Sequence, residues 1–72
     1  MKAEWKSYLE EDEVGRGFVC IQWGTAKRTR QVYAEFSPSE MEDDRAYVEA
    51  VLQEAHVVAH SRNSESNKEI SS

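Results

Sequence analysis

Hydrophobic and polar residues alternate over residues 29–36, which is the pattern of a strand with one buried face, and a mostly apolar run lies just before them at residues 17–23. Residues 17–23 are rich in β-branched and aromatic types, and residues 29–36 repeat that character. The stretch between them, residues 24–28, begins with a glycine and ends with two basic residues, as expected of a hairpin loop. On the second strand, the side chains expected to face the core are Val32, Ala34 and Phe36.

The first strand of this predicted hairpin has two faces, and either set of side chains can meet the core. The two sets are Phe18, Cys20 and Gln22, or Val19, Ile21 and Trp23. The second set is the more apolar throughout, but alternation alone leaves both open.

The residues after this hairpin carry several signals of a helix start. Ser37 and Glu40 have capping-box spacing, in which the Ser37 hydroxyl accepts from the N–H of Glu40 and the Glu40 carboxylate accepts from the N–H of Ser37. Pro38 occupies the first helical position, where its missing donor costs nothing. Phe36 and Met41 flank the box as a hydrophobic staple, which pins the end of the strand to the base of the helix.

From Pro38 to about His60, apolar residues recur with the 3.6-residue period of an amphipathic helix. The stripe expected to cover the sheet consists of Met41, Val48, Val51, Leu52, Ala55 and Ala59. Acidic residues crowd the first turns, where the helix dipole favours negative charge. We predict one domain over residues 1–60, followed by a polar, serine-rich, disordered tail over residues 61–72.

The N-terminal residues 3–9 fit either a short helix or a strand. We favour a strand, because a third strand would extend the hairpin into a sheet and an isolated two-stranded hairpin is marginal in water. The predicted fold is therefore α+β: a two- or three-stranded antiparallel sheet in β-β-β-α order, packed against one C-terminal helix.

Size and composition restrict the class of protein. A chain of 72 residues holds one modest core, and chains this small often gain support from self-association. The net charge of −5 argues against general affinity for nucleic acid or anionic lipid. The single cysteine, Cys20, excludes an internal disulfide and suits a reducing compartment. Because the sequence shows neither a signal peptide nor a membrane-spanning run, we expect a cytoplasmic protein.

No motif predicts an enzyme, a cofactor or a metal site. His56 and His60 lie four residues apart and would project from the same side of a helix, but zinc normally takes three or four protein ligands. Cys20 lies in the middle of a strand, with no helix N-terminus or glycine-rich turn nearby in sequence to activate it. We therefore expect a non-catalytic protein without bound metal or cofactor, in which Cys20 is a buried structural thiol.

Two surface patterns remain as candidate binding sites. On the side of the helix opposite its apolar stripe, small and uncharged residues recur and predict a protein interface, including a homodimer; these are Ala46, Ala50, Gln53 and Val57. Around the hairpin, basic and aromatic residues combine as they do in proteins that bind single-stranded nucleic acid; these are Arg16, Trp23, Lys27, Arg28, Arg30 and Tyr33.

The segment from Tyr8 to Val19, with its acidic run and the glycines that follow, resembles the opening strand, acidic turn and second strand of HicB-like antitoxins. The resemblance covers these residues alone and implies a β-β-β-α unit that binds a small toxin. The sequence as a whole predicts a small adaptor, inhibitor or regulator that binds an unidentified protein through an acidic helix or a sheet edge. Nucleic-acid binding by the basic hairpin is the alternative prediction.

Overall fold

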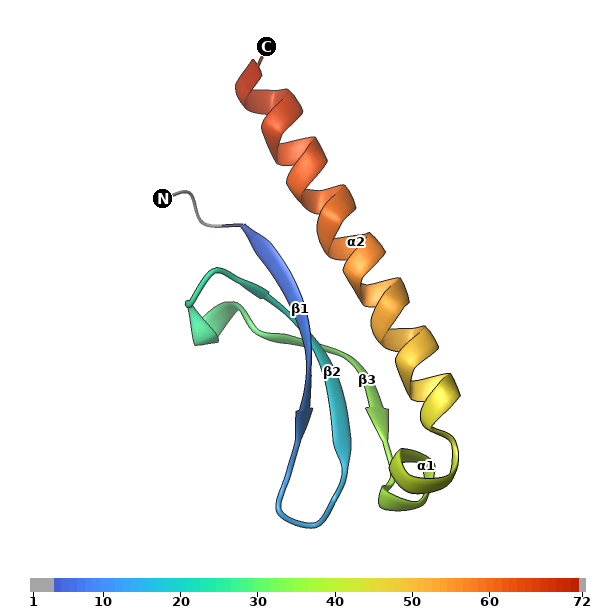
Figure 1. The fold of residues 1–72 in the computed structure, drawn as a ribbon. Helices are drawn as coiled ribbons and strands as arrows, with labels where there is room; N and C mark the ends of the chain where they lie inside the picture. Colours follow the sequence, from blue (N-terminus) through green and yellow to red (C-terminus); the bar gives the residue numbers. More distant parts are fainter. Residues whose placement is uncertain (1–3, 72) are drawn as a thin grey trace.

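The computed structural model describes the backbone of residues 4–71 and the side chains of residues 4–65, and it shows an antiparallel sheet beside one long helix (Figure 1). The elements in chain order are β1 (Trp5–Glu11), β2 (Gly17–Trp23), the 3-10 turn η1 (Lys27–Thr29), β3 (Gln31–Phe36), α1 (Pro38–Asp43) and α2 (Arg45–Ser71). The three strands lie in the order β1-β2-β3. The predicted α+β class and β-β-β-α order are confirmed, and residues 5–11 form a strand.

The core lies between α2 and one face of the sheet. Its buried side chains are Val19, Ile21, Phe36, Met41, Val48, Val51 and Ala55, with Trp5, Leu9, Ala34, Leu52 and Val58 packed around them. The helical stripe expected from the 3.6-residue period is therefore the one that covers the sheet. On β2, Val19 and Ile21 face the helix, so the more apolar of the two sets is the core set.

The capping box and staple connect the sheet to α1 as the sequence predicts. The N–H of Ser37 donates to Glu40 Oε1 at 3.0 Å, and the N–H of Glu40 donates to Ser37 Oγ at 3.2 Å. Phe36 and Met41, on either side of the box, are both buried in the core. The last residue of β3 is thus held against the first turn of α1.

The helical region departs from the prediction at both ends. Asp44 interrupts the expected single helix, and its carbonyl accepts from the N–H groups of Tyr47 and Val48 in the first turn of α2. α2 runs in a different direction from α1 (Figure 1). α2 then runs to Ser71, so the helix end expected near His60 was wrong. The segment from residue 61 continues the helix. The division into a domain over residues 1–60 and a disordered tail over residues 61–72 stays a prediction. Among the described residues, no helix is both long and apolar enough to cross a membrane.

A β-bulge in the hairpin reverses the expected orientation of Val32. Val19 pairs with Ala34, but the next residue of β2, Cys20, pairs with Val32, so that Tyr33 is an extra residue on β3. Ala34 keeps the predicted orientation toward α2. Val32 shares a face with Cys20 instead and is 54% exposed, so its predicted place in the core was wrong.

Candidate functional site

The outer edge of β1 is covered by α2 at Trp5, the first residue of the strand. The Asn63 side chain accepts from the N–H of Trp5 at 2.7 Å and donates to the carbonyl of Trp5 at 2.9 Å, which are the two bonds that a neighbouring strand would make. The Arg62 guanidinium lies over the Trp5 ring, 4.8 Å from its centroid. Asn63 therefore takes the place of a neighbouring strand at Trp5, the first residue of β1.

Beside this contact, β1 and α2 line a shallow, open hollow of about 400 Å³. Ser7 Oγ and His56 Nδ1 are hydrogen-bonded in its wall, and His60 also lines it. Within the part of the chain that the structure describes, no group of three His, Cys, Asp or Glu side chains gathers to hold a metal ion. The bond between Ser7 and His56 serves as a second tie between β1 and α2.

The outer edge of β3 is open by comparison. β3 pairs with β2 alone, and between residues 4 and 65 no side chain hydrogen-bonds to the main chain of β3. The middle of the strand also exposes apolar surface, because Val32 is 54% and Tyr33 is 43% exposed. An uncovered edge with unpaired N–H and C=O groups is a template for another strand.

A polar network covers the sheet face that has no helix, and sequence reasoning did not predict it. Arg30 Nε donates to the fully buried Cys20 Sγ at 3.3 Å, and its Nη2 pairs with Glu10 Oε2 at 2.5 Å. Tyr8 donates to Gln22 Oε1 at 3.0 Å. Partial burial raises the pKa of Tyr8 above its ordinary 10.0, so its hydroxyl is a donor at neutral pH.

This network shows that Cys20 is buried, as the sequence predicts, but on the side away from α2. The hydrogen bond from Arg30 to the sulfur is the main cause that raises the pKa of the guanidinium further above its ordinary value. Arg30 is thus a fixed positive charge held by Cys20 and Glu10. The sequence feature that could have predicted this network is the other face of β2, formed by Phe18, Cys20 and Gln22. The structure places these three residues on the side of the sheet away from α2.

The six residues of the predicted nucleic-acid surface do not form one surface. Arg16 lies in the turn at one end of β2, whereas Lys27 and Arg28 lie in η1 beyond its other end. Arg16 pairs with Asp12 at 3.0 Å. The Trp23 ring packs edge-on against Trp5 with centroids 5.3 Å apart. Tyr33 lies in the open edge strand, and Arg30 belongs to the network above. Nucleic-acid contact stays a prediction, but the geometry divides the residues proposed to make it.

The four residues of the predicted helix interface do share one exposed face of α2. Ala46, Ala50 and Gln53 are exposed, and Val57 is 61% exposed. Three of these side chains are small or polar, and Val57 is the one large apolar side chain among the four. Protein binding by this face stays a prediction.

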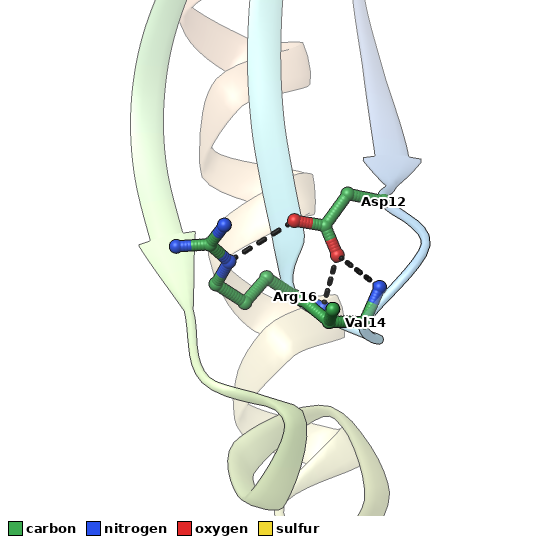
Figure 2. Close-up of polar contacts among 3 residues, drawn as sticks. All are labelled: Asp12, Val14 and Arg16. Carbon is green, nitrogen blue, oxygen red and sulfur yellow. Dashed lines mark hydrogen bonds and ion pairs between the residues drawn. The ribbon is translucent and has the colours of Figure 1, made fainter.

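The turn between β1 and β2 is organised by the Asp12 carboxylate (Figure 2). One carboxylate oxygen accepts from the N–H groups of Val14 and Arg16 at 3.1 and 2.8 Å, and the other accepts from Arg16 Nε at 3.0 Å. Gly15 has φ of 93°, a left-handed conformation that glycine adopts without strain. Partial desolvation opposes ionisation, but the hydrogen bonds from Arg16 and Val14 outweigh it and hold the pKa of Asp12 below its ordinary value of 3.8.

We expect Asp12→Asn to destabilise the protein at neutral pH and to have progressively less effect in acid. A lowered folded-state pKa stabilises the fold above the unfolded value of 3.8, and this contribution is lost as the pH falls through the folded-state pKa. Melting temperatures of both proteins across this range measure the difference. Glu13→Gln is the matched control, because it removes one charge from the same turn without removing a hydrogen bond that the structure describes. A constant gap between Asp12→Asn and the wild type at every pH would contradict this account.

Comparison with known proteins gives no match: no protein-family model, curated protein or solved structure matches this chain. The resemblance of residues 8–19 to HicB-like antitoxins therefore stays confined to that segment. The β-β-β-α order that it implies is the order of the structure. Binding of a small toxin, which it also implies, stays a prediction.

Proposed function

We propose that the protein is a small, non-catalytic protein-binding module, and that its binding site is the outer edge of β3. The main observation in support of this proposal is that the two edges of the sheet differ. Asn63 closes the edge of β1 at Trp5, whereas among the described residues no second strand and no side chain pairs with the main chain at the outer edge of β3. A partner that supplies an extended segment would complete the main-chain hydrogen bonds of β3.

The side chains of β3 support this assignment. Val32 and Tyr33 are exposed at the centre of the strand and provide apolar contacts for alternate residues of an added strand. The edge lies on a rigid support, because Phe36 is buried in the core at one end of β3. We place the module in the cytoplasm, since its one cysteine is unpaired and buried.

The first test uses peptides displayed from a random library and selected on the full chain. We expect selected peptides to slow hydrogen exchange at the amides of residues 31–36 and to lose binding to the double variant Val32→Lys, Tyr33→Lys. These substitutions change exposed side chains, so circular dichroism should show an unchanged fold. Ala50→Glu is the matched control, because it adds a charge to the exposed face of α2 and should leave binding intact.

Three results would overturn the proposal. The first is a failure to select any peptide, and the second is binding that Ala50→Glu abolishes while the β3 variant retains it. The third is tight binding of a labelled single-stranded oligonucleotide that Lys27→Glu with Arg28→Glu abolishes, which would favour the nucleic-acid alternative.

A further inference from the structure

The charge along the open edge changes sign from one end of β3 to the other. The residues just before the strand include the exposed bases Lys27 and Arg28 in η1. The end of the strand carries the exposed Glu35, and α1, which follows at once, carries the exposed Glu42 and Asp43. Among the described residues, none of these five side chains has an ion-pair partner. The edge is therefore basic where β3 begins and acidic where it ends.

This pattern is complementary to its own antiparallel copy. In a parallel arrangement, the basic end of one strand would lie beside the basic end of the other, and both ends would repel. In an antiparallel arrangement, the basic η1 of each copy lies beside the acidic end of the other copy's β3, so both ends attract. A two-fold axis that passes between the two β3 strands, beside the centre of each, generates both contacts at once.

We propose that the strand added at this edge is the β3 strand of a second copy of the chain, paired antiparallel across a two-fold axis. The proposal rests on the proposed function of the β3 edge and names its partner. The two sheets become one continuous sheet in the order β1-β2-β3-β3-β2-β1, whose remaining edges are the two β1 strands, each covered by Asn63 at Trp5. Val32 and Tyr33 of each copy meet at the centre, where their exposed apolar surface is partly covered.

The contact is small, and the dimer is accordingly weak. Stable protein interfaces bury about 1,200–2,000 Å² in total, and pairing of two short strands buries less than this. We expect a dissociation constant of the order of 10–100 μM, in the range of transient complexes. The antiparallel orientation is set by the charges, so the affinity should fall as salt screens them.

Sedimentation equilibrium of the full chain and two charge-reversed variants tests the proposal. The first variant, Lys27→Glu with Arg28→Glu, makes both ends of the edge acidic. The second, Glu35→Lys with Asp43→Lys, makes both ends basic. All four substitutions are at exposed side chains. We expect each variant alone to dimerise at least tenfold more weakly than the wild type, and an equimolar mixture of the two to dimerise again. Ala50→Glu should dimerise as the wild type does.

The outcomes separate the partner from the site. A wild type that stays monomeric to about 1 mM overturns self-pairing, while peptides that protect β3 would still support the edge as a binding site. A dimer that Ala50→Glu breaks and the β3 charge variants leave intact overturns self-pairing and assigns self-association to α2. Failure of the mixed variants to associate, when both single variants are monomeric and folded, also overturns the antiparallel arrangement.

Discussion

Val48→Ala is expected to lower the free energy of unfolding by about 2–3 kcal/mol, since it removes buried methyl groups and leaves a cavity. Val48 is fully buried between α2 and the sheet. Domains of this size rarely have more than about 3–5 kcal/mol of stability, so the loss is a large part of the total. Thermal unfolding followed by circular dichroism should show a fall in the melting temperature of roughly 10–20 °C.

The control for this substitution is the same change on the other side of the same helix. Val57 is 61% exposed, and Val57→Ala should change the free energy of unfolding by no more than about 0.5 kcal/mol. Alanine also has the higher helix propensity, so any small change should be favourable. Equal losses for the two substitutions would show that α2 does not cover the sheet with the face described here.

The face of α2 that enters the core was predictable because a buried helical stripe has a period that the sequence displays directly. Val48, Val51 and Ala55 follow that period, and each is buried. Likewise, the capping box depends on residues within one turn of each other. These features are local, and local spacing determines them.

Features that depend on contacts between distant segments were not predictable in the same way. The bulge at Tyr33 depends on how β2 and β3 align. This shift of one residue places Val32 on the sheet face away from α2 instead of in the core. Residues 61–65 are polar and mostly poor helix formers, so the sequence indicated a tail. The bonds from Asn63 to Trp5 connect segments 58 residues apart and stabilise this turn as helix.

For the candidate binding site too, local features were predictable from the sequence and contacts between distant segments were not. The sequence predicted that a sheet edge or the helix binds a partner, and the chain contains both surfaces. It did not distinguish the two edges, because the protection of β1 comes from α2, whose course beyond His60 was predicted wrongly. The basic hairpin was proposed as one surface from nearness in sequence, yet β2 separates Arg16 from η1 by the length of a strand.

Gly17→Ala is expected to destabilise the protein by about 1–3 kcal/mol, because the added methyl group has no space. A Cβ at Gly17 would lie 2.2 Å from Met41 Sδ, 2.8 Å from Met41 Cε and 3.1 Å from Met41 Cγ. Met41 is itself buried, so the end of its side chain has to shift within a packed core to relieve the overlap. Denaturant unfolding of the variant and the wild type measures the loss.

A double-mutant cycle determines whether Met41 is the cause. Met41→Ala opens a cavity at the position where the new methyl group would lie, so Gly17→Ala should cost much less in that background than in the wild type. The expected coupling between the two sites is favourable and of the order of 1 kcal/mol. Equal costs in both backgrounds would attribute the effect to the backbone of β2 instead. A favourable coupling would show that Met41 of α1 packs so closely on β2 that position 17 has no room for a side chain. This packing would then hold α1 against the end of the sheet from which β3 leads into the capping box.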